Sequence, residues 1–141
     1  MDDDVYELRS GPPSIDEYLE LRRAAGLSAR TRAEAEAGID GAWHAVHVVE
    51  RSSGTAVGMG RILSDGGWYF HICDMATLPS HQRRGLGKAV LRALLDEIDR
   101  RAPGEPLINL LADEPGRPLY RAMGFEDSAP DTIGMSLRGR H

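Results

Sequence analysis

The chain has 141 residues, of which 41% are hydrophobic and 28% charged, and its formal net charge at pH 7 is −5. This length and balance predict one folded domain, residues 1–141, with a core that needs no disulfide support. The acidic charge disfavours a nucleic-acid partner, because phosphate backbones are bound mainly by clustered Lys and Arg. No apolar run is long enough to span a membrane, and Met1 to Asp4 has the wrong charge for a signal peptide, so we expect a cytoplasmic protein without a membrane partner.

Caps and turn residues divide the chain into elements of alternating type. Ser14, with Glu17 three residues later, has the signature of a helix N-cap. Small and β-branched residues on both sides of Ser52-Ser53-Gly54 predict a hairpin. Apolar positions recur every three or four residues from Leu86 to Ile98, which predicts a helix with one face on a sheet. In chain order we expect a strand at Val5–Arg9, helices ending at Ala25 and Ala37, hairpin strands at Val46–Glu50 and Thr55–Leu63, a strand at Trp68–Met75, and the helix that begins at Leu86.

The last third of the chain predicts two more strands and a short helix. Leu107–Leu111 is almost wholly apolar, as expected of a strand covered on both faces. Its position after a strand and a helix implies a parallel pair with Trp68–Met75. Because proline is tolerated in a first helical turn, a helix should run over Pro118–Met123. Phe125 and Thr132–Leu137 should then supply closing strand material, which makes the fold α/β with a mixed sheet.

The most informative segment follows the predicted strand and opens the predicted central helix. It reads Gln82-Arg83-Arg84-Gly85-Leu86-Gly87-Lys88-Ala89. Its two glycines allow close approach of the backbone, and a helix start offers unpaired N–H groups with partial positive charge. The cationic side chains oppose the helix dipole, which favours acidic residues there, and a bound anion explains that reversal. We expect the segment to hold a pyrophosphate; the alternative is a glycine turn before a basic helix, with no ligand.

Two other phosphate-binding motifs do not fit this segment. A Walker loop requires Gly where Gln82 stands and Ser or Thr where Ala89 stands. A dinucleotide fingerprint requires a third glycine where Val90 stands. The sequence therefore supports neither a nucleoside triphosphate nor NAD as the ligand.

Two segments resemble the GNAT superfamily of acyl-CoA N-acyltransferases. The family's apolar-x-apolar-x-Pro strand end, followed by Q/R-x-x-G-x-G/A, matches Met75 to Pro79 and Gln82 to Gly87, and its Tyr-x-x-x-Gly-Phe matches Tyr120 to Phe125. The resemblance covers nearly the whole chain, most securely Trp68 to Phe125. It implies a mixed, mostly antiparallel twisted sheet of about six to seven strands with about four helices and a parallel strand pair at the cofactor site.

The resemblance further implies an N-acetyltransferase that moves an acetyl group from acetyl-CoA to a primary amine, by direct attack in a ternary complex and without a metal. Tyr120 would donate a proton to the departing CoA thiolate, and a backbone N–H near Met75 would meet the oxyanion. The alternative for Tyr120 is a packed tyrosine whose hydroxyl is satisfied elsewhere. The expected cofactor-binding residues are Met75, Ala76, Thr77, Gln82, Arg83, Arg84, Gly85, Leu86, Gly87, Lys88, Ala89, Asp113 and Tyr120.

His71 and Asp74 are the candidates for the general base. An amine with a pKa of ~10.4 must lose a proton before it attacks a thioester. Strand alternation places the two side chains on opposite faces unless a bulge intervenes, so only one should meet the amine. His71 occupies a position where some arylalkylamine acetyltransferases carry a histidine, and its ordinary pKa suits the task. The alternative is a strand histidine that is simply packed or exposed.

Three functions stay open on this reading. The first is the N-acetyltransferase, with a small-molecule or peptide amine as its acceptor. The second is a non-catalytic CoA-binding regulatory domain, which Asp113 keeps open because it stands where many relatives have an asparagine, and a carboxylate accepts but cannot donate. The third is an interaction module without a cofactor. The histidines lack metal-ligand spacing with Cys73, so no metal is expected, and a homodimer is a further expectation because dimers are common in this fold.

Overall fold

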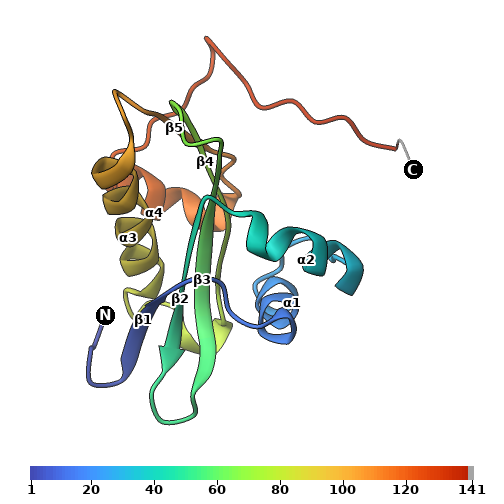
Figure 1. Cartoon of the computed structure of the whole chain (residues 1–141), viewed down its shortest axis with the longest axis vertical. Helices are drawn as coiled ribbons and strands as arrows, with labels where there is room; N and C mark the ends of the chain where they lie inside the picture. The colour runs from blue at the N-terminus through green and yellow to red at the C-terminus, as the bar shows by residue number, and fades with distance from the viewer. Residues whose placement is uncertain (140–141) are drawn as a thin grey trace. The chain divides into compact units, whose positions relative to one another are not determined.

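The computed structural model describes residues 1–139 (Figure 1), and the chain forms two compact units, Met1–Leu110 and a second from Leu111 onward. The first unit contains β1 (Tyr6–Ser10), α1 (Ile15–Ala24), α2 (Arg32–Gly38), β2 (His44–Glu50), β3 (Thr55–Ser64), β4 (Tyr69–Thr77), α3 (Leu86–Arg101) and β5 (Leu107–Leu110), with 3₁₀ turns at Ile39–Gly41 and Pro79–His81. The second unit contains a 3₁₀ turn at Glu114–Gly116 and α4 (Arg117–Ala122). The interpretation of residues 1–141 as one domain stays a prediction.

The five strands form one mixed sheet in the order β1-β2-β3-β4-β5. Each neighbouring pair is antiparallel except β4 and β5, which run parallel with Tyr69 opposite Leu107 and Ile72 opposite Leu110. The predicted α/β class, the hairpin and the parallel pair are therefore confirmed. Helix α3 is the crossover connection between the parallel strands β4 and β5, as the order of elements predicted.

The closing strand predicted at Thr132–Leu137 is wrong. Residues 123–139 contain neither a helix nor a strand. A strand exists only where its backbone pairs with a neighbour, and alternating apolar residues do not by themselves supply that neighbour. Within residues 1–139 the sheet therefore has five strands instead of the expected six or seven.

Helices cover both faces of the sheet in the first unit. Figure 1 shows α3 on one face and α1 with α2 on the other. The predicted stripe of α3 is confirmed, because Leu86, Val90, Leu94 and Ile98 are all buried. These residues pack on the face that carries Phe70 and Ile72, whose side chains are 0% and 2% exposed. The core on this face holds α3, and therefore its N-terminus, in a fixed position on the sheet.

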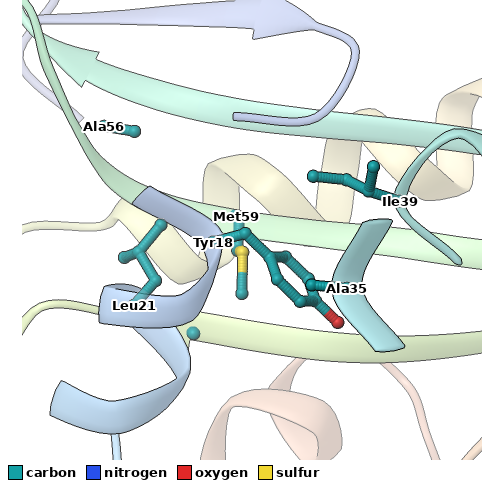
Figure 2. Close-up of a cluster of buried hydrophobic side chains, with 7 residues drawn as sticks. Tyr18, Leu21, Ala35, Ile39, Ala56 and Met59 are labelled. Carbon is teal, nitrogen blue, oxygen red and sulfur yellow. The ribbon is translucent and has the colours of Figure 1, made fainter. Parts of the chain in front are cut away.

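The opposite face carries a second apolar cluster beneath α1 and α2 (Figure 2). Its buried members are Tyr18, Leu21, Ala35, Ile39, Ala56, Met59 and Ala76. Both helices begin at complete capping boxes, Ser14 with Glu17 and Thr31 with Glu34, which satisfy two orphan N–H groups at each start. The predicted cap at Ser14 is thus confirmed, and α1 begins at the next residue, Ile15.

Gly60 of β3 lies directly beneath α3. A Cβ at this position would lie 2.6 Å from Met75 Sδ and 2.7 Å from Val90 Cγ1. We expect Gly60→Ala to lower the free energy of unfolding by about 1–3 kcal/mol, because overpacking forces neighbours off their rotamers. Urea unfolding measures this. Gly58→Ala is the matched control, since a Cβ there meets its nearest atoms at 3.7 Å; equal losses in both variants would contradict the steric explanation.

Candidate active site

A β-bulge interrupts β4 at Asp74 and Met75. Met59 pairs with Ala76 and Arg61 pairs with Cys73, so these two residues of β4 oppose Gly60 alone. Asp74 accordingly adopts a left-handed backbone with a φ of 55°, which is uncommon outside glycine. The bulge turns the Asp74 side chain toward α1 and places it on the same face as His71, whose neighbours Phe70 and Ile72 face α3. Simple alternation would have put Asp74 and His71 on opposite faces.

Three donors hold the Asp74 carboxylate. The Tyr18 hydroxyl donates to Oδ2 at 2.6 Å, Arg61 Nε donates to the same oxygen at 2.6 Å, and Arg22 Nη1 donates to Oδ1. The side chains of Arg22 and Asp74 are each 10% exposed. Burial, together with the neighbouring Asp74 carboxylate, raises the pKa of Tyr18. This charged cluster therefore connects α1 and β3 to the bulge of β4.

His71 belongs to a separate hydrogen-bonded chain that links the parallel strands. Its Nδ1 lies 2.8 Å from Asn109 Oδ1, and Asn109 Nδ2 donates to the Tyr69 hydroxyl at 2.8 Å. Because the amide oxygen can only accept, this arrangement assigns the proton of a neutral imidazole to Nδ1. The lone pair is then on Nε2, for which no hydrogen-bond partner occurs among residues 1–139. In this tautomer Nε2 of His71 is able to accept a proton.

The edge of β4 beyond the bulge is open toward β5. β5 pairs with β4 only from Tyr69 to Ile72, so no described strand continues that ladder along Cys73–Thr77. Strand edges of this kind can pair with an extended amide chain through backbone N–H and C=O groups. The predicted residues Met75, Ala76 and Thr77 all lie on this stretch.

Residues Gln82 to Ala89 form the turn before α3 and its first helical turn. Arg83 and Gly85 are both left-handed, with φ values of 61° and 80°, and no side chain caps the helix. The first N–H groups of α3 therefore stay available to an anion. Among the predicted binding residues, Leu86 is buried, so only its backbone amide can meet a ligand, whereas Gln82, Arg83, Arg84 and Lys88 are exposed. The helix thus begins at Leu86, as the sequence predicted, and the role of the segment in binding stays a prediction.

Contacts from β1 support this turn. Tyr6 is buried, and its hydroxyl lies 2.8 Å from His81 Nδ1. Arg84 Nη1 donates to the same hydroxyl at 3.5 Å, and Gln82 Nε2 donates to the Thr77 carbonyl at 3.3 Å. Sequence reasoning missed Tyr6 and His81, since no local pattern connects residues so far apart in the chain.

The predicted residues Tyr120 and Asp113 lie in the second unit. The Tyr120 ring packs edge-on against Phe125, with centroids 6.1 Å apart. A Cβ on Gly116 would lie 2.8 Å from Tyr120 Cε2, so glycine leaves room for this ring. Burial and the negative charge of Asp113 raise the pKa of Tyr120. Its hydroxyl is therefore protonated at neutral pH and able to donate.

Cys73 follows Ile72 at the start of the bulge. Burial, with a smaller contribution from the Asp74 carboxylate, raises the pKa of its thiol to about 11. Thiolate is the reactive form of cysteine, so a thiol with this pKa is a poor nucleophile at neutral pH. Cys73 is thus poorly suited to act as a nucleophile.

A recess opens between α1, the Ile39–Gly41 turn and the bulge. It is shallow and open to solvent. Its lining includes Pro12, Tyr18, Ile39, Met59, Arg61 and Asp74. The recess therefore has apolar walls and the charged cluster at one side.

Residues 1–139 contain neither a membrane-spanning helix nor a cluster of metal-ligating side chains. None of the helices within residues 1–139 combines the length and apolarity needed to cross a bilayer. In the same range, three or more His, Cys, Asp or Glu side chains nowhere gather as they would around a metal ion.

Comparison with known proteins identifies the family. The acetyltransferase (GNAT) domain matches residues 42–127, which is more than half of the chain. The chain belongs to the GNAT acetyltransferase family. This range includes the bulge of β4, the turn before α3 and Tyr120.

Solved structures with the same fold agree with this assignment. A crystal structure of a Staphylococcus aureus protein of unknown function, described as a probable acetyltransferase, has a TM-score of 0.89 and 31% identity, covering 95% of this chain and 99% of that chain. A GNAT family acetyltransferase from Streptococcus pneumoniae has a TM-score of 0.79 over 96% of this chain and 99% of that chain. Its 23% identity supports the fold alone.

Curated relatives match over part of their length. The chloroplastic GCN5-related N-acetyltransferase 3 of Arabidopsis thaliana is 38% identical over 54% of this chain, and the histone acetyltransferase TAP1 of Glycine max is 31% identical over 68%. The matches span 31% and 44% of these two relatives, so this GNAT chain corresponds to less than half of either one.

Proposed function

We propose that this GNAT protein transfers an acetyl group from acetyl-CoA to a primary amine by direct attack in a ternary complex. One observation carries the proposal. The uncapped, glycine-opened start of α3 follows directly on the open edge of β4. The helix start would bind the diphosphate of CoA, and the strand edge would pair with the amides of its pantetheine arm. The two features follow one another along the chain, as the two parts do in CoA.

The proposed binding site uses mostly backbone groups. The amides from Arg83 to Ala89 would receive the pyrophosphate, with Arg83, Arg84 and Lys88 adding charge. Each helix-terminus interaction contributes about 0.3–1 kcal/mol, and each hydrogen bond to a charged group about 1.5–3 kcal/mol. Several such contacts suffice for micromolar affinity, about −8 kcal/mol. Met75 to Thr77 would align the pantetheine arm and hold the thioester at the bulge.

We propose His71 as the general base, with Asp74 as the second candidate. The hydrogen bond to Asn109 leaves Nε2 of His71 as an acceptor, and a neutral imidazole with a free nitrogen can take a proton from an ammonium group. Both oxygens of Asp74 already accept hydrogen bonds from charged or hydroxyl donors. This favours a supporting role for Asp74, in which it orders the recess where the amine would bind.

Tyr120 is the proposed general acid. Its raised pKa keeps the hydroxyl protonated over the pH range in which the amine reacts. A backbone N–H near Met75 would stabilise the oxyanion. The acceptor would be a small-molecule or peptide amine that enters the recess beside Tyr18.

A non-catalytic CoA-binding domain is the second candidate, and Asp113 favours it. This exposed carboxylate replaces the amide expected there and can accept but not donate a hydrogen bond to the pantetheine arm. Normal binding of acetyl-CoA with no turnover on any amine would support this candidate over the enzyme.

Binding of acetyl-CoA tests the proposed site. At 100 times its Kd, acetyl-CoA should raise the unfolding free energy by about 2.7 kcal/mol. The double variant Arg83→Glu/Lys88→Glu should bind at least about tenfold more weakly by calorimetry, because each reversal turns attraction for the diphosphate into repulsion. Arg92→Glu, on the exposed side of the same helix, is the matched control and should change the Kd less than about twofold. Absence of binding heat with the unaltered protein would overturn the proposal.

A further inference from the structure

The charged cluster at the recess carries one positive charge in excess. Arg61 and Arg22 both contact the Asp74 carboxylate, so two guanidinium groups face a single negative charge. The Tyr18 hydroxyl also donates to Asp74, and its raised pKa keeps it uncharged at neutral pH. The Arg61 side chain is only 19% exposed, and a charge so poorly solvated is stabilised by a counter-charge.

The two arginines differ in how completely their N–H groups are used. Arg22 donates to Asp74 through Nη1 and to the carbonyl and hydroxyl oxygens of Ser28 through Nη2. Arg61 donates to Asp74 through Nε and to the Gly38 carbonyl through Nη1 at 3.2 Å, and its Nη2 has no hydrogen-bond partner within residues 1–139. No side-chain nitrogen or oxygen of those residues is both buried and unpaired, and Arg61 lines the recess. Its Nη2 is therefore open to a molecule that enters there.

The acidic residues of the neighbouring elements do not supply the missing negative charge. Those of α1 and α2 already pair with basic side chains or with an N-cap: Asp16, Glu17, Glu20, Glu34 and Glu36. Asp40 of the Ile39–Gly41 turn is exposed and is not among the residues that line the recess. An anionic group of a bound molecule would therefore be the counter-charge for Arg61.

Arg61 and His71 lie on the same face of neighbouring strands. Arg61 pairs with Cys73 and His71 pairs with Leu63, so the two residues are diagonal neighbours in the ladder of β3 and β4. Diagonal neighbours of this kind are about 7–8 Å apart, which long side chains can bridge. Nη2 of Arg61 can donate to an anion, whereas Nε2 of His71 can accept a proton. A small molecule with both a carboxylate and an amine suits this pair of groups.

We propose that the acceptor is a free amino acid, whose carboxylate binds Nη2 of Arg61 and whose amine meets His71. This inference rests on the proposed acetyl transfer and names its substrate class. One carboxylate neutralises the excess charge of the cluster, whereas a phosphate monoester, with a charge of about −1.5 to −2, would reverse its sign. A polyamine or a basic peptide would add positive charge instead. The contact is a charge-assisted hydrogen bond, which is stronger than one between neutral groups.

Paired acceptors test the substrate class. Glycine, L-leucine, β-alanine and 4-aminobutanoate are each compared with the amide of the same compound, in which a neutral group replaces the carboxylate. For at least one pair, kcat/KM for the acid should exceed that for the amide about tenfold or more, because the amide lacks a hydrogen bond between two charged groups. The amine of an α-amino amide is less basic than that of the acid, so its larger neutral fraction opposes the expected preference.

The outcomes separate this inference from the proposed function. A preference below about tenfold in every pair, or fastest transfer to spermidine, would overturn the amino acid as acceptor and leave acetyl transfer standing. Transfer to none of these amines by a protein that binds acetyl-CoA would overturn the proposed function and this inference together.

Substitution of Arg61 tests the contact itself. Arg61→Gln should lower kcat/KM for the preferred amino acid at least about tenfold and change that for its amide less than about threefold. General damage to the site would lower both values alike, so their ratio isolates the contact with the carboxylate. Arg32→Gln, which removes an exposed guanidinium group of α2, is the matched control and should leave the ratio unchanged. An unchanged ratio in Arg61→Gln would overturn the proposal.

Product inhibition gives a second measurement that needs no variant and does not depend on how Arg61→Gln folds. The N-acetyl derivative of the preferred amino acid should inhibit the unaltered protein at a concentration at least about tenfold lower than the N-acetyl derivative of its amide. Equal inhibition by the two products would contradict binding of the carboxylate.

Discussion

Replacement of Tyr120 by phenylalanine should slow acetyl transfer by about 10²–10⁴-fold, because this is the range that general acid catalysis contributes. The affinity for acetyl-CoA should stay nearly unchanged, since only the hydroxyl is removed and the ring still packs on Phe125. Steady-state kinetics and calorimetry measure the two quantities separately. Loss of kcat with an unchanged Kd would identify an interaction made during reaction and not during binding.

The control for this prediction keeps the hydroxyl and changes the packing. Phe125→Leu alters the ring that contacts Tyr120 and should reduce kcat by less than about tenfold. The pH dependence adds a second check. The negative charge of Asp113 helps to raise the pKa of Tyr120, so Asp113→Asn should shift the alkaline fall in rate to lower pH. An unchanged rate in Tyr120→Phe would remove Tyr120 from the role of acid.

Asp74→Ala should lower the free energy of unfolding by about 3–5 kcal/mol, the usual cost of removing one partner from a buried ion pair. The reason is that Arg22 and Arg61 would lose the carboxylate that both of them contact. Arg22 is itself buried, so water cannot fully replace this partner. Urea unfolding measures the loss, and a decrease below about 1 kcal/mol would show that the cluster contributes little to stability.

Asp74→Asn separates charge from backbone strain and from catalysis. Asparagine tolerates the left-handed backbone of this position and keeps one acceptor oxygen, so its loss of stability should be smaller. At a temperature where this variant is folded, acetyl transfer should persist if His71 is the base. His71→Gln should then lose activity without a comparable loss of stability. The opposite outcome would assign the proton transfer to Asp74.

Local sequence patterns were sufficient to predict several elements of the fold. The spacing of Leu86, Val90, Leu94 and Ile98 predicted the buried face of α3, since helical periodicity is a property of neighbouring residues. Ser14 with Glu17 predicted a cap for the same reason. The turn before α3 was also predictable, because the two glycines and the basic residues that surround them carry the information within a few positions. The family resemblance extended this reading to the open edge of β4.

The charged cluster was beyond what local patterns could reveal. Asp74 meets Arg22 across 52 positions of sequence and Arg61 across 13, and both contacts depend on the bulge opposite Gly60. Alternation alone would have placed Asp74 on the other face. The strand predicted at Thr132–Leu137 was wrong for a related reason. An alternating pattern describes which face the side chains prefer, whereas a strand also requires a neighbouring strand to pair with. Long-range pairing therefore accounts for both differences.

The pairing of β4 with β5 ends at Ile72, and this affects how the binding selectivity of the protein could change in evolution. Main-chain N–H and C=O groups are the same for every amino acid except proline, which lacks the donor. Substitutions at Met75 or Thr77 would therefore change the side chains around a bound molecule. The backbone groups that could pair with that molecule would be kept. Successive substitutions along this stretch could therefore change selectivity gradually, without passing through a variant that no longer binds the molecule.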